Sequence, residues 1–191
     1  LRHGDGGCIV LRKVSVSCSS LSTLGRELQL RGLVLDGCTF SDGGKLEDSV
    51  STFKSLKELT FMPEYALAKN PWVPHHLMDV MRSAVVHVCA LKGLHQLQTL
   101  TLHNCTAVGL DEFLQHVPLK DLGLLGSKSG WLPSQEGSKD PLHSESLQVL
   151  RLGFVDPEMS GRLMSAKLPA LQQLHLSALK CVKKVPGCRD R

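Results

Sequence analysis

Few residues of this 191-residue chain have the types and spacing that catalysis or metal binding requires. Cys181 and Cys188 are separated by six residues and no second cysteine pair accompanies them, whereas a structural zinc site needs four ligands. His87 and Cys89 have a ligand-like spacing for a strand, but they lie in a helical pattern, in which their side chains diverge. His75-His76 would need distant partners to hold a metal. We therefore predict that the protein has no metal site and no cofactor.

Motifs of nucleophilic and nucleotide chemistry are also missing. The chain contains no GxSxG, HExxH or GxGxxG sequence. Residues 125–129 place a glycine near a lysine, but without the GxxxxGK[ST] spacing of a phosphate loop. These observations predict that the protein is not an enzyme and has no catalytic residues.

Composition narrows the classes of partner. The chain has 22 Lys and Arg residues against 18 Asp and Glu residues, which gives a net charge of +4 without a cationic block. Because nucleic-acid binding depends on clustered cations, we expect no nucleic-acid partner. No apolar run approaches the ~18 residues that span a bilayer, and the most apolar stretch, 77–91, is interrupted by charged residues. We therefore expect no membrane span.

The cysteines and one sequence triplet bear on the cellular compartment. The 7 cysteines form an odd set without the compact spacing of a disulfide framework. This set favours buried thiols in a reducing compartment. Asn104-Cys105-Thr106 has the form of a glycosylation acceptor, which would favour a secreted protein, although such triplets often arise by chance. We predict an intracellular, cytoplasmic protein.

A recurring pattern, apolar-x-x-apolar-x-apolar, organises the chain, in which 35 residues are leucine. Seven copies begin at Leu11, Leu30, Leu56, Leu97, Leu119, Leu147 and Leu171. Two of them continue to a cysteine at the ninth position, Cys38 and Cys105, which we expect to be buried and bonded to neighbouring backbone. Two apolar residues that are two apart on a strand point to the same side, so stacked copies would share one leucine core.

The pattern resembles the LxxLxLxxN/C consensus of the leucine-rich repeat family. Its cysteines and irregular spacing are similar to those of the cysteine-containing, ribonuclease-inhibitor-like subclass. The resemblance implies an α/β fold, a horseshoe-shaped solenoid of about seven repeats with a concave parallel sheet and outer helices. We expect residues 1–191 to form a single such domain. Since the chain begins at Leu1 without a signal region, we expect it to be a segment of a longer protein.

Helices are expected between the strands, on the outer side of the stack. Leucines at helical spacing predict a helix over 20–28. Asp111 predicts the capped start of a second helix, which Pro118 stops. Asp156 predicts the start of a third over 157–168. The residues of this third helix expected to face the core are Leu163, Met164 and Leu168.

The unit between Leu56 and Leu97 is 41 residues long and contains three prolines followed by a helical pattern over 77–91. We predict one enlarged unit with a long outer helix, which Gly93 ends. A concealed repeat at Met81-Ala84-Val86-Cys89 is the alternative. It would leave 16 residues before Leu97, which is too few for a strand and its return.

Residues 126–146 have no apolar period, and their Gly, Ser, Pro and charge content predicts a surface loop insertion. Trp131 on this loop is either an anchor for a partner or a plug against the edge of the stack. Both interpretations stay open, and we include Trp131 among the candidate binding residues as a loop anchor.

A surface for partners follows from the strand pattern. In each copy, the third, fifth and seventh positions point away from the leucine core. On the expected concave sheet they carry mixed side chains without a row of cations, which disfavours a polyanion groove and favours a protein partner. The larger groups, and thus the candidate anchors, are Met62, His103, Leu125 and Arg151. The full set of candidate partner-binding residues is Glu58, Thr60, Met62, Thr99, Thr101, His103, Asp121, Leu125, Arg151 and His175.

The family resemblance implies protein recognition without catalysis. We predict an interaction module or scaffold that binds a protein partner or serves as a subunit of a larger complex. The alternative is the ligand-sensing segment of a regulated protein, such as a nucleotide-binding immune receptor or an F-box substrate adaptor. Because the ends of a repeat stack expose leucine, a neighbouring domain or subunit should cover at least one of them.

Overall fold

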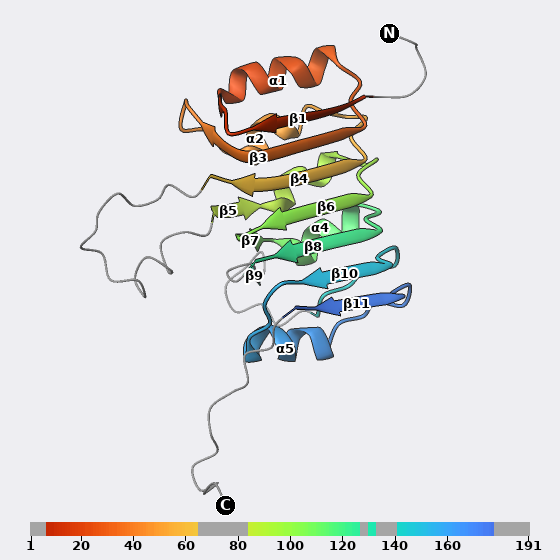
Figure 1. Ribbon diagram of the computed structural model, residues 1–191. Helices are drawn as coiled ribbons and strands as arrows, with labels where there is room; N and C mark the ends of the chain where they lie inside the picture. The colour runs from red at the N-terminus through yellow and green to blue at the C-terminus, as the bar shows by residue number, and fades with distance from the viewer. Residues whose placement is uncertain (1–6, 65–83, 127–129, 133–140, 178–191) are drawn as a thin grey trace, which may run out of the picture.

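The chain forms an α/β structure with two parallel sheets and helices packed against them (Figure 1). The computed structural model describes residues 7–64, 84–126, 130–132 and 141–177. The main sheet has the strand order β1-β3-β4-β6-β8-β10-β11, with β2 paired to β3 beside this path, and its pairings are all parallel. Its strands therefore follow one another across the sheet in chain order. A second sheet has the order β5-β7-β9 and is also parallel.

The bounds of these elements are as follows. The main sheet contains β1 (Cys8–Arg12), β2 (Ser15–Val16), β3 (Gly32–Phe40), β4 (Glu58–Pro63), β6 (Thr99–His103), β8 (Asp121–Leu125), β10 (Val149–Leu152) and β11 (Gln173–Leu176). The second sheet contains β5 (Ala84–His87), β7 (Cys105–Val108) and β9 (Gly130–Leu132). The helical segments are α1 (Cys18–Glu27), α2 (Leu46–Val50), the 3-10 helix η1 (Val88–Gly93), α4 (Leu110–His116) and α5 (Pro157–Met164).

Two rows of apolar side chains cross the main sheet because the pairing register stays constant from strand to strand. Leu35, Phe61, Leu102, Leu124 and Leu152 are successive partners in one row, and each is at most 4% exposed. Leucines of separate repeat copies, such as Leu35, Leu102 and Leu152, therefore lie aligned in one stack, as predicted for a shared leucine core. The parallel row consists of Leu33, Leu59, Leu100, Leu122 and Leu150.

A repeated main-chain hydrogen bond fixes this register at the amino-terminal edge of the main sheet. The carbonyl of Arg31 accepts the N–H groups of Lys57 and Glu58, with N···O distances of 2.8 and 3.0 Å. The carbonyl of Lys57 accepts in the same way from Gln98 and Thr99, at 2.8 and 2.9 Å. The same two-donor arrangement recurs at the carbonyls of Gln98, Lys120 and Gln148. Each strand thus starts at a fixed position relative to the one before it.

The first strand differs from the sequence prediction, which placed the first repeat copy at residues 11–16. Ile9 and Leu11 occupy the core positions instead, since they pair with the buried leucines of β3. Residues 15–16 form β2, which pairs with the far end of β3. Val14 is 42% exposed. Val14 is apolar and fits the repeat spacing, but the backbone places this residue outside the core.

Two of the predicted helices are confirmed, with adjusted ends. α1 starts earlier than expected, after Ser17, whose Oγ accepts the N–H of Ser20 at 3.1 Å. α5 begins after Asp156, whose Oδ1 accepts the N–H of Met159 at 2.7 Å. The prediction that Met164 faces the core is wrong, because this last residue of α5 is 86% exposed. Among the described residues, no helix has the length and apolar character needed to cross a membrane.

The helix predicted to be capped by Asp111 is α4, and that cap is wrong. The cap lies two residues earlier, at Gly109, which has a φ of +78° that glycine adopts without steric cost. Asp111 and Glu112 lie in the first turn, where carboxylates interact favourably with the helix dipole. Phe113 and Leu114 are buried, which attaches the helix to the core.

The predicted long helix over 77–91 is wrong in the part that the structure describes, because β5 and η1 take its place. β5 belongs to the second sheet, so it is not a concealed copy of the main-sheet repeat. Val86 of the strand and Leu91 of the 3-10 helix are both buried. A strand followed by a tight helical turn therefore buries the side chains that had suggested one long helix. Residues 77–83 lie outside the described part.

The predicted surface loop over 126–146 contains a strand, since β9 pairs with β7. Trp131 in this strand is 8% exposed and belongs to the hydrophobic core. The assignment of Trp131 as an exposed loop anchor is therefore wrong, and the plug interpretation agrees with its burial. Residues 127–129 and 133–140 of the segment lie outside the described part of the chain.

The last strand of the main sheet is much more exposed than the strands in the middle. Leu174 and Leu176 of β11 continue the two apolar rows, but they are 45% and 39% exposed. Ile9 and Leu11 of β1, at the opposite end, are partly buried. That a neighbouring domain or subunit covers one of these ends stays a prediction.

Replacing Leu100 with alanine should lower the free energy of unfolding by about 2–5 kcal/mol, because this side chain is fully buried in the middle of the sheet. Leu174→Ala is the matched control, since Leu174 lies in the same row but is 45% exposed. The control should cost less than about 1 kcal/mol. Urea unfolding of both variants measures the difference, and equal losses would contradict a shared leucine core.

Trp131→Ala should lower the free energy of unfolding by about 3–5 kcal/mol, because the indole is removed from the core. The neighbouring Leu132 is 50% exposed, so Leu132→Ala should have a small effect and serves as the control. Thermal unfolding compares the two variants. A Trp131→Ala variant that is as stable as wild type would contradict the burial of Trp131 in the core.

Candidate functional site

One face of the main sheet carries the residues predicted to bind a partner. On each strand these residues alternate with the buried leucines, so they lie on the opposite side of the sheet. We call this side the open face. In Figure 1, α2 and α4 lie behind the main sheet. The open face holds all ten predicted residues: Glu58, Thr60 and Met62 of β4, Thr99, Thr101 and His103 of β6, Asp121 and Leu125 of β8, Arg151 of β10 and His175 of β11.

An ion pair on the open face joins β8 to β10. Arg151 Nη2 donates a hydrogen bond to Asp121 Oδ2. Gly123 lies opposite Arg151 in the register, and Asp121 lies two residues before Gly123 on the same strand, so the guanidinium reaches diagonally across the two strands. The other carboxylate oxygen, Oδ1, is buried and has no hydrogen-bond partner in the described part of the chain. Arg151 is therefore a neutralised and positioned group, not a free cation.

Gly123 also sets how the centre of the open face is packed. A Cβ at Gly123 would lie 3.2 Å from Thr101 Cγ2, which is tighter than ordinary side-chain contact. Thr101 itself is only 9% exposed. Of the ten predicted residues, Thr101 thus offers very little area to a partner, and the accessible groups lie around it.

His103 is a titratable group on the open face whose pKa is altered by its environment. It lies opposite Leu125 in the register and is partly buried. Burial lowers the pKa of His103 below its ordinary value of 6.5, and the nearby carboxylate of Asp36 opposes part of that shift. The imidazole is therefore neutral near pH 7, so that one ring nitrogen donates a hydrogen bond and the other accepts one.

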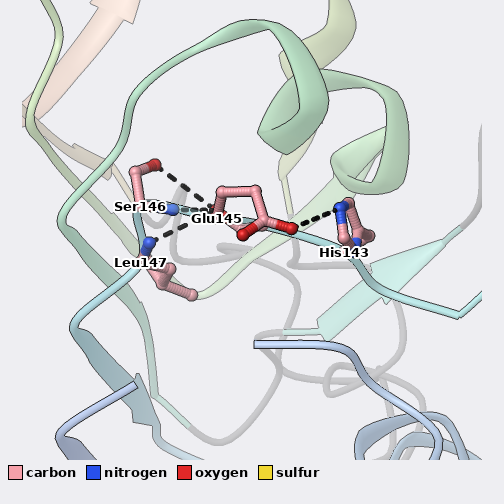
Figure 2. A network of polar contacts seen from close by, with 5 residues as sticks. His143, Glu145, Ser146 and Leu147 are labelled. Atoms are coloured by element: carbon pink, nitrogen blue, oxygen red, sulfur yellow. Dashed lines mark hydrogen bonds and ion pairs between the residues drawn. The ribbon is translucent and has the colours of Figure 1, made fainter. Parts of the chain in front are cut away.

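A buried polar turn holds the start of β10, the strand that carries the ion-paired arginine. Ser144 is 1% exposed, and its Oγ accepts the N–H groups of Ser146 and Leu147 at 3.4 and 3.3 Å. Figure 2 shows His143 facing Glu145 beside this turn, with His143 Nε2 3.1 Å from Glu145 Oε1. The hydrogen bonds of Ser144 thus position the start of β10, where the chain forms neither helix nor strand.

The cysteines predicted to be buried are buried. Cys38 Sγ donates to the carbonyl of Leu11 at 3.3 Å, and Cys105 Sγ donates to the carbonyl of His103 at 3.2 Å. Burial raises the pKa of Cys105 to about 12. The Cys105 thiol is therefore protonated and unreactive at neutral pH, which is typical of a structural cysteine.

The candidate metal ligands are not assembled in the described part of the chain. No group of three or more His, Cys, Asp or Glu residues there could hold a metal ion. His87 ends β5 and Cys89 lies in η1, so these two residues do not share a helix as the sequence had suggested. Cys181, Cys188 and His75-His76 lie outside the described residues.

Sequence reasoning missed a set of residues along one edge of the main sheet. The position before each main-sheet strand from β3 onward carries a basic or amide side chain. These residues are Arg31, Lys57, Gln98, Lys120, Gln148 and Gln172. The signal is the second position of each repeat copy, which from the second copy on is always arginine, lysine or glutamine.

No protein-family model matches the chain, and comparisons with curated proteins and with solved structures find no significant match.

The lowered pKa of His103 predicts a specific pH dependence of stability. The folded state favours the neutral imidazole, so its contribution is complete above the unfolded value of 6.5 and is lost as the pH falls through the lower folded pKa. Wild type should therefore lose more stability than His103→Gln between about pH 7.5 and pH 5. Melting curves of both proteins across this range measure the effect, and parallel pH profiles would contradict it.

Proposed function

We propose that the chain is a leucine-rich repeat segment that binds a protein partner through the open face and has no catalytic role. The observation that carries this proposal is the constant register of the main sheet. It places equivalent residues of successive strands side by side and leaves a continuous face whose side chains are not used by the core. The irregular, cysteine-containing subclass is part of the proposal, since Cys38 and Cys105 hydrogen-bond to backbone carbonyls.

The character of the open face supports a protein as the ligand. Its rows are short side chains interrupted by a few larger ones, and the ion-paired Arg151 leaves little net positive charge for a polyanion. Apolar contact area is provided by Met62 and Leu125. Beside them lies the neutral ring of His103, which can form hydrogen bonds. Such a mixture of apolar groups and a few positioned polar groups is what protein interfaces present.

The ion pair gives the proposed interface a preorganised element. Arg151 is held by Asp121, so its remaining donors have a fixed direction before a partner arrives. Ordering of a long side chain on binding is thus reduced, which favours affinity. We include subunit assembly in the proposal, because the same face could bind either a transient partner or a permanent one.

An intracellular location belongs to the same proposal. The cysteines that the structure describes, Cys8, Cys18, Cys38, Cys89 and Cys105, are free thiols. Buried, unpaired thiols such as Cys105 are compatible with a reducing compartment.

The double variant His103→Ala/Arg151→Glu should weaken partner binding at least about tenfold while the protein stays folded, since both side chains contribute to the open face and not to the leucine rows. Affinity capture with wild type, followed by mass spectrometry, identifies the bound proteins. Titration of the strongest candidate against wild type and variant then measures the loss of affinity.

The matched control is His116→Ala/Arg162→Glu, which changes the same residue types on α4 and α5. The control should bind the partner like wild type. If the two double variants bind equally, or if only the helix variant loses binding, the open face is not the interface. Melting curves accompany each titration so that unfolding is not mistaken for lost contact.

A further inference from the structure

The amino-terminal edge of the main sheet gathers cations that are far apart in the sequence. Arg31, Lys57 and Lys120 directly precede β3, β4 and β8. Because all strands of the main sheet run parallel, these positions lie along the same edge, where the arrows of Figure 1 begin. The cations of the chain are spread along the sequence, and the fold brings these three to one edge of the sheet.

Two more cations extend this edge. A hollow of about 460 Å³ next to it is lined by Arg26 at the end of α1 and by Lys54 ahead of β4. The polar side chains of Gln29, Thr52 and Ser55 line the same hollow. We call the set Arg26, Arg31, Lys54, Lys57 and Lys120 the basic rim.

The basic rim has little internal compensation. None of its five cations makes an ion pair with a described residue. Glu27 and Glu58 are the nearest acidic residues in the sequence, and Asp121, which follows Lys120, is already paired with Arg151. Among the described residues, five unpaired cations stand against three carboxylates near this edge, those of Glu27, Glu58 and Glu145, whose neighbour Ser146 hydrogen-bonds the carbonyl of Leu119. An excess of positive charge remains along the edge.

The remaining positions of this edge suggest what kind of polyanion fits. Between and beyond the cations lie Gln98, Gln148 and Gln172, each directly before a strand. Glutamine amides can both donate to and accept from a peptide main chain. The described edge positions include no aromatic side chain on which bases could stack. The edge thus combines partners for carboxylates with partners for peptide groups.

The dimensions agree with an extended peptide. Neighbouring strands are about 4.8 Å apart, so the edge from Arg31 to Lys120 covers about 14 Å and the edge to Gln172 about 24 Å. An extended chain advances about 3.3 Å per residue, so about seven residues would span it. The acidic residues of such a peptide would lie at its end over Arg31, Lys57 and Lys120.

We propose that the basic rim binds an extended acidic peptide segment of a protein partner, with carboxylates on the cations and the peptide main chain on the glutamines. This surface is separate from the open face, and it gives the protein a second docking site. Positive charge along the rim would also speed association with an acidic partner.

The test uses a fluorescent octaglutamate peptide and the complete chain in an anisotropy titration. Wild type should bind with an affinity that falls as NaCl rises from about 50 to 300 mM, because exposed charge pairs are screened. An octaglutamine peptide should bind at least about tenfold more weakly, since it keeps the main chain and lacks the charges.

The variant Lys57→Gln/Lys120→Gln should bind octaglutamate about tenfold more weakly than wild type. Arg12→Gln/Lys13→Gln is the charge-matched control, because it removes two positive charges at the opposite edge of the sheet, where Arg12 is paired with Asp36. The control should stay within about twofold of wild type. Arg31→Gln, an exposed single change, keeps the test valid if the double rim variant fails to fold.

Three results would overturn the proposal: no saturable binding of octaglutamate, equal losses in the rim and control variants, or tighter binding of an octathymidine oligonucleotide that depends on the same lysines. The last result would assign the rim to nucleic acid. The open-face variant His103→Ala/Arg151→Glu should bind octaglutamate like wild type, so a failure of the open-face interface and a failure of the basic rim are separate outcomes.

Discussion

Constant register between parallel strands is the constraint on which the rest of the molecule depends. At each step across the main sheet, one carbonyl before a strand accepts two N–H groups from the start of the next, so no strand can slide by a residue. A slip of one residue would move every leucine of that strand to the opposite face. The core, the open face and the basic rim therefore all result from one repeated main-chain arrangement, applied to a sequence with leucine at two fixed positions.

The open face shows how such a scaffold can carry individual chemistry. Arg151 reaches diagonally across two strands to Asp121, and Gly123 leaves space that Thr101 fills at the centre of the face. Burial keeps His103 neutral although it lies near Asp36. The ion pair of Arg151 and the lowered pKa of His103 both depend on neighbouring residues that the register brings together. The face is consequently a set of positioned groups of low net charge, whereas the edge of the same sheet concentrates unpaired cations.

Most of the main sheet could be predicted from sequence because two leucines with alternate spacing determine both the strand and its buried face. The prediction failed where apolar residues fitted more than one arrangement. Val14 matched the repeat but lies outside the core, and the apolar residues near Val86 matched a helix although they belong to a strand and a 3-10 turn. Trp131 was placed on a loop because its neighbours are polar, yet pairing with β7 draws it into the core. The ion pair and the altered pKa of His103 could not be predicted, since they depend on distances between strands.

The hydrogen bonds at the amino-terminal edge have a consequence for how the protein can change over time. They join main chain to main chain, and the side chains at those positions are exposed or partly exposed. Exchange of one such side chain for another therefore leaves the architecture intact, because exposed substitutions of this kind usually alter stability by less than about 0.5 kcal/mol. Substitutions at this edge of the sheet are therefore tolerated by the fold, whereas substitutions of the buried leucines are not. The chemistry of this edge and the preservation of the fold thus depend on different residues of the same six-residue pattern.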